Sequence, residues 1–289
     1  MKIAYTGYQV QEQYTGGVTN DEYTDLLVFL TSKALDITAA VWNDEKVDWK
    51  NFDVVIIKSP WDYHENLAAF TGWLDRISNL SIKVLNPVDL IKWNSDKHYL
   101  QAIANNGLPI IQSEFIEKGD TFSDRYFELF NTDKLVVKPC VSAGAKNTLI
   151  IDKAHFAGQS QVVNKLLETE AYLVQPFMEE IKGGEWSFMF FNGTYSHAVL
   201  KTPKQGDFRV QHYHGGSFSF PTPNPVHIEQ AGKYVAMLPF QTLYARVDGV
   251  VSNGAFQLME LEVIDPYLFF NGNNDLLENY YSALLKHIS

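Results

Sequence analysis

The sequence predicts an α/β domain at the N-terminus followed by an α+β domain. In the first third of the chain, short apolar runs alternate with helix-like segments, which is typical of a parallel sheet. Beyond Pro109, apolar runs are joined by turns instead, and Asn192-Gly193 supplies the positive φ angles of a tight hairpin. With 289 residues, 46% of them hydrophobic, the chain is long enough to bury a sizeable core.

The N-terminal unit is expected to span residues 1–93. Residues 53–57 are rich in β-branched side chains, which favours a buried strand, and Leu26, Leu27 and Leu30 recur at helical spacing. In chain order we expect strands at 2–5, 53–57 and 82–85, and helices at 21–35 and 67–77.

The second unit is expected to span residues 94–289. Asn94 to Lys97 is typical of a capped helix start, and Gly107-Leu108-Pro109 ends that helix. We expect strands at 135–138, 148–151, 172–175, 186–191, 195–200 and 256–263, and helices at 99–105 and 276–288.

Charge and cysteine content exclude several classes of protein. The formal net charge is −11, from 23 Lys+Arg against 34 Asp+Glu, which argues against non-specific binding to nucleic acid or anionic membranes. The single cysteine, Cys140, cannot form an intramolecular disulfide. No stretch approaches the roughly 18 consecutive apolar residues of a membrane helix. We therefore expect a cytoplasmic protein without nucleic-acid or membrane partners, and leave self-association open.

A lysine followed by small residues is the first candidate for chemistry. Lys138 ends an apolar strand, and Ser142 and Gly144 lie in the loop after it. Backbone N–H groups in such a loop can approach phosphate oxygens while the lysine supplies a positive charge. No Walker motif is present. The alternative is an ordinary exposed turn.

Three carboxylates form the second candidate. Glu260 and Glu262 are two residues apart on an expected strand, so both point to one face, and Asp248 precedes them. Like charges on one face are costly unless a cation lies between them, and hard oxygen ligands favour Mg²⁺ or Mn²⁺. The alternative is a solvated strand face.

The third and fourth candidates surround the hairpin. A strand ends at a bend formed by Gln175, Pro176, Phe177 and Met178, and the backbone of such a bend can bind an adenine edge. The carboxylate of Glu185 follows shortly after and can bind a ribose. The alternative is an ordinary strand-to-loop transition with a glycine turn.

Basic residues follow the hairpin. Lys201 and Arg209, with Asp207 between them, can stabilise charge on a transferring phosphoryl group, or belong to a mobile basic loop. We interpret the nearby His212 and His214 as loop or substrate residues, because a third nitrogen or sulfur ligand for a metal is lacking.

Taken in order, these features resemble the ATP-grasp superfamily, and most closely its glutathione synthetase-like branch. The resemblance implies a Rossmann-like N-terminal domain of the pre-ATP-grasp type and an ATP-grasp domain whose two subdomains, about 108–175 and 176–289, clamp ATP. The lid-like subdomain is the first of the two.

The resemblance also implies roles for individual residues. Lys97 and Lys138 match the phosphate-binding lysines, and Arg209 matches the arginine facing the γ-phosphate. Gln175 to Met178 fall at the adenine hinge, Glu185 matches the ribose acid, and Asp248, Glu260 and Glu262 match the ligands of Mg²⁺ or Mn²⁺. Many relatives have Asn where Glu262 stands, and the loop after Lys138 is less rich in glycine than theirs.

Four segments are similar to the O-ureidoserine cyclo-ligases, the cycloserine-forming subgroup, and its uncharacterised relatives; they are Ser-Pro-Trp-Asp-Tyr, Lys-Pro-x-x-Ser-Ala-Gly-Ala, Ser-His-Ala-Val-Leu-Lys and Gly-Asp-Phe-Arg-Val-Gln. The resemblance implies an ADP-forming carboxylate–amine ligase that acts on an amino-acid-like substrate through an acyl phosphate, either within one molecule or between two. The alternatives are an ATP-grasp kinase that releases a phosphorylated product and a non-catalytic ATP-binding protein. In none of these schemes is Cys140 needed as a nucleophile.

The substrate end is expected at Trp61, Asp62 and Tyr63. They follow a buried strand, and ligands of open α/β sheets bind beyond the carboxyl ends of strands. Asp62 is expected to pair with the ammonium group of the substrate while the two rings limit water. The alternative is a packed loop at the domain junction.

Overall fold

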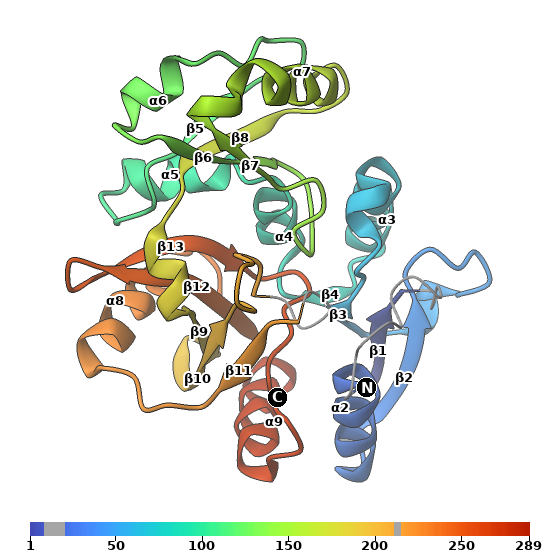
Figure 1. The fold of residues 1–289 in the computed structure, drawn as a ribbon. Helices are drawn as coiled ribbons and strands as arrows, with labels where there is room; N and C mark the ends of the chain where they lie inside the picture. Colours follow the sequence, from blue (N-terminus) through green and yellow to red (C-terminus); the bar gives the residue numbers. More distant parts are fainter. Residues whose placement is uncertain (9–20, 211–214) are drawn as a thin grey trace.

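The computed structural model describes residues 1–8, 21–210 and 215–289. Its strands form three sheets that follow one another along the chain and surround a common centre (Figure 1).

The N-terminal sheet is parallel throughout, in the order β2-β1-β3-β4. Its strands are β1 (Lys2–Gly7), β2 (Asp36–Val41), β3 (Val54–Ser59) and β4 (Lys83–Leu85). Helix α2 (Glu22–Ser32) packs on the face that contains Val54 and Ile56, and α3 (Leu67–Asn79) on the face that contains Val55 and Ile57. Both faces are buried, which explains why β3 reads as a continuous apolar run.

The middle sheet is antiparallel, in the order β5-β8-β6-β7. Its strands are β5 (Glu114–Ile116), β6 (Lys134–Pro139), β7 (Leu149–Asp152) and β8 (Tyr172–Pro176). Two helices, α6 (Arg125–Leu129) and α7 (Phe156–Leu167), share one apolar cluster with it. Helices α4 (Val88–Asn94) and α5 (Tyr99–Asn105) connect it to the N-terminal sheet. It forms the upper lobe of Figure 1, here called the lid.

The C-terminal sheet is also antiparallel, in the order β11-β10-β9-β12-β13. Its elements are β9 (Glu185–Phe191), β10 (Thr194–Thr202), β11 (Ser217–Ser219), α8 (Pro225–Ala236), β12 (Tyr244–Ser252), β13 (Ala255–Glu262) and α9 (Asn274–Ile288). Single 3₁₀ turns cover Trp49–Asn51, Tyr63–Glu65, Lys153–His155 and Glu179–Gly183.

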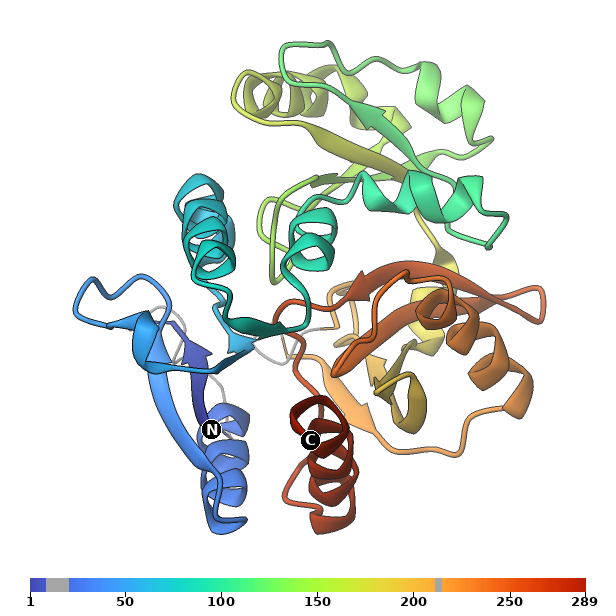
Figure 2. The same cartoon turned by 180° about the vertical axis from the view of Figure 1, so that it is seen from behind.

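The two faces of the C-terminal sheet have different partners. Phe188, Phe190 and Val247 face α8, whereas Met189 and Tyr244 share a cluster with α9, α2 and the N-terminal sheet. Helix α9 therefore lies between the sheet and the N-terminal domain, as both ribbon views show (Figures 1 and 2). The polar end of this second face lies beneath the lid and contains the candidate site.

Most expected elements are present within a few residues of their predicted bounds. The hairpin is confirmed, with φ of 48° at Asn192 and 74° at Gly193. Strands β2, β5, β11 and β12 and helices α4, α6, α7 and α8 were not predicted.

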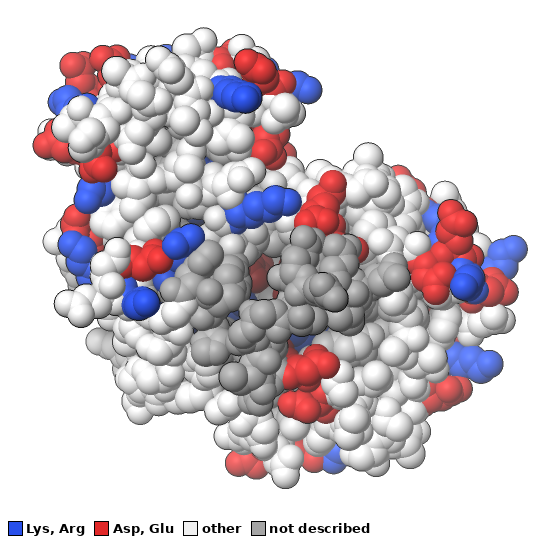
Figure 3. Space-filling view, turned by 45° about the vertical axis from the view of Figure 1, so that its right-hand side comes forward, with Lys and Arg blue, Asp and Glu red and all other residues white. Residues whose placement is uncertain are grey.

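The molecular surface agrees with the composition. On the face drawn in Figure 3, the described basic side chains are scattered among acidic ones and form no continuous basic patch. In the part of the chain that the structure describes, no helix is long and apolar enough to cross a membrane.

Candidate active site

Charged side chains from four neighbouring strands lie on one face of the C-terminal sheet, here called the charged face. The strand register pairs them across the sheet: Lys201 with Glu185, Asp248 with Ser187 and Glu260, and Arg246 with Glu262. A bulge beside Asp248 requires Gly249, because a Cβ there would lie 2.2 Å from the Gln257 carbonyl oxygen. The expectation that Glu260 and Glu262 share a face is confirmed by the burial of Leu261 between them.

Arg246 is the centre of this group, and sequence reasoning missed it. Its Nε lies 3.0 Å from Asp248 Oδ1, its second amino group contacts Glu262, and its first donates to the Tyr267 carbonyl at 3.0 Å. Burial opposes ionisation of Asp248, but Arg246 and then Lys201 lower its pKa to about 2. Burial raises the pKa of Glu262 to about 8 although Arg246 opposes that shift. The Arg246 guanidinium therefore favours the ionised form of Asp248, whereas Glu262 keeps a raised pKa although it contacts the same group.

Two lysines converge on Glu260. Lys97, buried just before α5, lies 3.2 Å from Glu260 Oε1 and donates to Ser142 O at 3.1 Å and Ser142 Oγ at 3.2 Å. Burial opposes ionisation of Glu260, while Lys97 and then Lys138 lower its pKa. The structure thus brings together residues from the N-terminal side of α5, from β6 of the lid and from β13.

Lys138 lacks a hydrogen-bond or ion-pair partner among the described residues. Burial lowers its pKa, and the charge of Lys97 acts in the same direction while Glu260 opposes it. A half-buried ammonium group without a partner is costly unless a ligand supplies the counter-charge. An anionic ligand such as a phosphate fits this position.

The loop after Lys138 contains residues with positive φ angles. Gly144 has a φ of 62° and Ala145 a φ of 58°, so the small residues allow a left-handed turn. Lys146 lies 3.6 Å from Glu65, which brings the loop against the N-terminal domain. Cys140 is buried at the start of the loop, and burial raises the pKa of its thiol, as expected of a residue with no nucleophilic role.

The predicted adenine hinge is the crossing from the lid to the C-terminal sheet. Gln175 donates to Ser113 Oγ at 2.8 Å, and the Phe177 N–H donates to the Lys134 carbonyl at 2.9 Å. Gly184, with a φ of 113°, lies so close to Leu200 that a Cβ would be 2.7 Å from it. Glu185 follows directly, and its buried carboxylate accepts from Lys201. Its predicted ribose contact stays a prediction.

The second basic loop lies beside this hinge. Phe208 packs against Phe177 with ring centroids 6.3 Å apart, and Arg209 donates to Asp207 Oδ2 at 2.8 Å. The guanidinium held against Asp248 and Glu262 is that of Arg246, so the phosphate-facing role predicted for Arg209 stays untested. His212 and His214 lie outside the described residues.

The three residues of the expected substrate loop have different surroundings, and Trp61 and Tyr63 are described first. The Trp61 indole donates to the Asp265 carbonyl at 3.4 Å. Burial raises the pKa of Tyr63, and the neighbouring Asp265 and Glu260 charges add to it, which places its hydroxyl near the acidic group. Both rings therefore lie at the site.

Asp62 does not fit its predicted role. Its buried carboxylate accepts from the Trp42 indole at 2.7 Å and from Asn43 at 3.4 Å, both within the N-terminal domain. The packed-junction alternative describes Asp62 better than ammonium binding does, because a carboxylate already engaged by buried donors is not free for a ligand.

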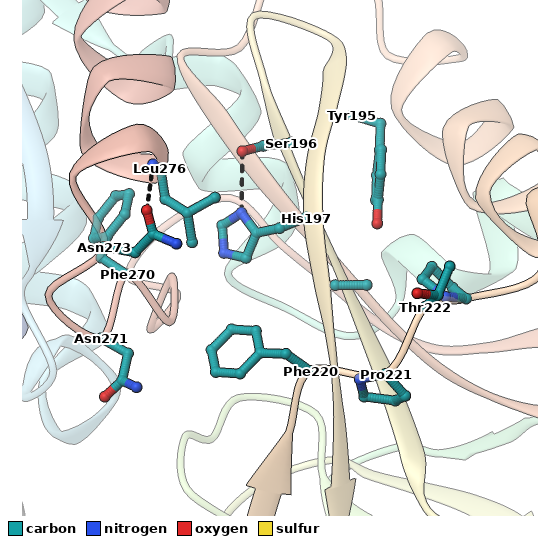
Figure 4. A pocket seen from close by; sticks show the side chains of 12 residues that line it. Tyr195, Ser196, His197, Phe220, Pro221, Thr222, Phe270, Asn271, Asn273 and Leu276 are labelled. Atoms are coloured by element: carbon teal, nitrogen blue, oxygen red, sulfur yellow. Dashed lines mark hydrogen bonds between the residues drawn. The ribbon is translucent and has the colours of Figure 1, made fainter.

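A cavity of about 530 Å³ lies elsewhere, at the opposite end of β10 (Figure 4). Its described lining carries no carboxylate, lysine or arginine. The Nε2 atom of His197 donates a hydrogen bond to the Leu268 carbonyl at 2.8 Å. Burial lowers the pKa of His197, which favours its neutral form. A phosphate-rich ligand therefore fits the charged face and not this cavity.

Comparisons with known proteins agree with this geometry. The family model "D-cycloserine synthetase DcsG, N-terminal domain" matches residues 3–86, and "Prokaryotic glutathione synthetase, ATP-grasp domain" matches residues 123–233. The crystal structure of D-cycloserine synthetase DcsG superposes over 100% of both chains with a TM-score of 0.86 at 23% identity. D-alanine–D-alanine ligase from Bacillus anthracis, complexed with ATP, covers 99% of this chain and 98% of that chain with a TM-score of 0.73 at 15% identity.

The chain has the ATP-grasp fold.

Two curated relatives extend the comparison. This ATP-grasp chain is 30% identical to the cycloserine biosynthesis protein DcsG of Streptomyces lavendulae over 177 residues, 58% of this chain and 59% of that protein. It is 26% identical to a probable alpha-L-glutamate ligase of Legionella pneumophila over 182 residues, 62% of this chain and 58% of that protein. The matched region thus spans less than two thirds of either relative.

The charged face of this ATP-grasp protein fits ATP with a divalent metal. Lys138 is a half-buried cation whose side chain has no hydrogen-bond or ion-pair partner in residues 1–8, 21–210 and 215–289, and Lys97 contacts Glu260 beside it. Asp248, Glu260 and Glu262 offer the hard oxygen atoms that Mg²⁺ prefers. These carboxylates would hold the metal in place of the cations that pair with them in the structure.

Replacing Asp62 by alanine tests its reassigned role in this ATP-grasp protein. We expect the free energy of unfolding to fall by about 1–3 kcal/mol, because the buried Trp42 indole loses its acceptor. Urea unfolding measures this loss, and KM values for all substrates should stay within about twofold of wild type. Asp44→Ala, an exposed acid of the same domain, is the control. Unchanged stability with a KM for the amino-acid substrate raised more than about tenfold would restore the ammonium-binding role.

Proposed function

We propose that the chain is an ATP-dependent, ADP-forming carboxylate–amine ligase that acts on an amino-acid-like substrate through an acyl phosphate. The observation that carries the proposal is the convergence of Lys97 and the unpartnered Lys138 on Glu260, beside the Arg246–Asp248–Glu262 group. The cations proposed to bind phosphate and the acids proposed to bind metal lie in one place, which supports a catalytic protein over a non-catalytic binding protein.

The chemical problem is that a carboxylate is a poor electrophile. Transfer of the γ-phosphoryl group of ATP to a carboxylate oxygen forms an acyl phosphate and releases ADP. An amine then attacks the acyl carbon, the C–N bond forms, and phosphate leaves with the oxygen atom that came from the acid. Such chemistry needs positioning and charge stabilisation more than covalent participation by the protein.

Each residue of the site has a place in that scheme. Lys97 and Lys138 would bind ATP phosphates and offset the charge that develops during transfer, and Arg246 would stabilise the acyl phosphate. Asp248, Glu260 and Glu262 would hold Mg²⁺ or Mn²⁺, which when bound neutralises phosphate charge. Gln175 to Met178 would take the adenine, and Glu185 the ribose. Lys201 would keep Glu185 and Asp248 ionised, as the ion pairs of the structure indicate.

A screen for substrate-dependent ADP release tests the proposal. Purified protein with ATP and Mg²⁺ is offered amino acids, pairs of amino acids and ureido-serine analogues, and ADP is followed by a coupled assay. We expect ADP only when a carboxylate and an amine are both present, in one molecule or in two. Accumulation of a phosphorylated product without an amine would indicate a kinase, and ATP binding without turnover in every mixture would indicate a binding protein. Either result would overturn the proposal.

A further inference from the structure

The segment that follows β13, residues 264–270, is irregular in structure and yet firmly held. Five consecutive backbone carbonyls each accept a hydrogen bond from a side chain that lies far away in the sequence or on another strand. The donors are Tyr244 to Ile264 at 2.9 Å, Trp61 to Asp265 at 3.4 Å, Lys58 to Pro266 at 2.9 Å, Arg246 to Tyr267 at 3.0 Å and His197 to Leu268 at 2.8 Å.

A buried ion pair completes this attachment. Lys58 and Glu22 lie 2.8 Å apart, with side chains only 1% and 4% exposed, and both belong to the N-terminal domain. Glu22 also accepts from the Leu268 N–H at 2.7 Å and the Phe270 N–H at 3.4 Å. Because buried polar groups are costly when unsatisfied, these bonds fix the backbone of the segment against both the N-terminal domain and the C-terminal sheet.

The segment carries one acidic side chain, Asp265, and that side chain is not used by the attachment. Pro266 disfavours a helical backbone at Asp265, and the bonds on either side hold the segment in place. Within the described ranges, no other residue forms a hydrogen bond or ion pair with its carboxylate. Its electrostatic neighbours are Lys58 first, then Arg246 and Glu260, which places it between the N-terminal domain and the charged face.

The negative charge of Asp265 is not matched by a positive charge among its described neighbours. The described part of the charged face holds four acids and four bases, so their formal charges cancel; they are Asp248, Glu185, Glu260 and Glu262, and Lys97, Lys138, Lys201 and Arg246. Lys58 is taken by Glu22 and by the Pro266 carbonyl. Burial raises the pKa of Asp265 to about 7, as expected of a carboxylate that has lost water without gaining a partner. A ligand that brings one positive charge would restore the balance.

We propose that Asp265 binds the α-ammonium group of the amino acid whose carboxylate is activated. The inference rests on the proposed ligase function and replaces Asp62 as the ammonium-binding acid. The Arg246 guanidinium donates to the carbonyl of Tyr267, which lies two residues after Asp265 in the sequence. A substrate carboxylate activated beside Arg246 would therefore direct its α-ammonium group toward Asp265. Trp61 and Tyr63 border the same position and would limit its access to water. The rigid attachment of the segment then serves to hold one binding carboxylate in place.

Two changes made together test the inference, one in the protein and one in the substrate. The wild type is compared with Asp265→Asn, using an amino acid that gave ADP release in the screen and its desamino analogue, which keeps the carboxylate. Loss of a charge-assisted hydrogen bond is expected to raise the KM for the amino acid about 10- to 100-fold while the KM for ATP stays within about twofold. The wild type should prefer the amino acid over its analogue by a similar factor, and Asp265→Asn should lose that preference.

Controls separate this role from a structural one. Because the carboxylate has no partner among the residues that the structure describes, Asp265→Asn should keep or raise the melting temperature, whereas a structural acid would lower it. Asp36→Asn, an exposed acid on β2, removes the same charge away from the site and should leave every constant unchanged. A retained preference for the amino acid, or an equal rise in both KM values, would overturn the role of Asp265 while leaving the ligase function intact. If the wild type gives no substrate-dependent ADP release, the ligase function fails and this inference fails with it.

Discussion

Replacing Glu260 by glutamine is expected to reduce substrate-dependent ADP formation by about 10³-fold or more, with the protein still folded. Glu260 is the residue on which Lys97 and Lys138 converge, and it is a predicted metal ligand on β13. Glutamine keeps the shape of the side chain but removes the charge that pairs the lysines and attracts a divalent cation. Because the Glu260 side chain is one third exposed, 33%, the core of the sheet is not disturbed.

Steady-state ADP release over a range of Mg²⁺ concentrations checks this expectation. Circular dichroism and the melting temperature confirm that the variant is folded. Glu229→Gln, an exposed acid on α8, is the matched control and should behave as wild type. Wild-type turnover in Glu260→Gln at low Mg²⁺ concentration would remove Glu260 from the metal site.

Replacing Lys138 by methionine is expected to lower kcat by about 10²–10³-fold, the usual cost of removing one group that stabilises transition-state charge. Methionine has a similar length and suits the partly buried end of β6, so the fold should be retained or slightly stabilised once the unpartnered charge is gone. Lys97→Met should instead weaken ATP binding, because Lys97 also holds the loop through Ser142.

Lys134→Met on the same strand is the matched control for Lys138. Lys134 lies at the other end of β6, where its ammonium contacts Asp152 at 4.0 Å and stacks over Phe177. Equal losses of kcat in both variants, or no loss in either, would show that Lys138 does not bind phosphate.

Local patterns predicted the parts of the fold in which one segment determines its own structure. The β-branched run of β3, the Asn192-Gly193 turn and the alternation of Glu260 and Glu262 are of this kind. Helices α7 and α8 were missed because few of their residues are buried and their polar positions include Gly, Gln and Asn. Their stability comes from packing on a sheet that lies elsewhere in the sequence.

Site residues were predicted where two charged residues recur at the spacing of a strand. They were missed where the interacting partners come together only in the folded structure. Arg246-Val-Asp248 has the same two-residue spacing as Glu260-Leu-Glu262, and an antiparallel pairing of the two would have identified Arg246. Asp62 is the opposite case, since nothing near it in the sequence indicates that Trp42 satisfies its carboxylate. The role inferred for Asp265 depends likewise on bonds from Lys58 and Trp61, which are more than 200 residues away.

The fate of the acid's oxygen atoms tests the proposed ligation most directly. The substrate acid is labelled with ¹⁸O in its carboxylate, and the phosphate released with ADP is analysed by mass spectrometry. Activation through an acyl phosphate predicts that each phosphate carries one oxygen atom from the acid and that the product amide keeps the other. Unlabelled phosphate released alongside ADP, or label retained in a stable phosphorylated product, would contradict the assignment of this ATP-grasp chain as a carboxylate–amine ligase.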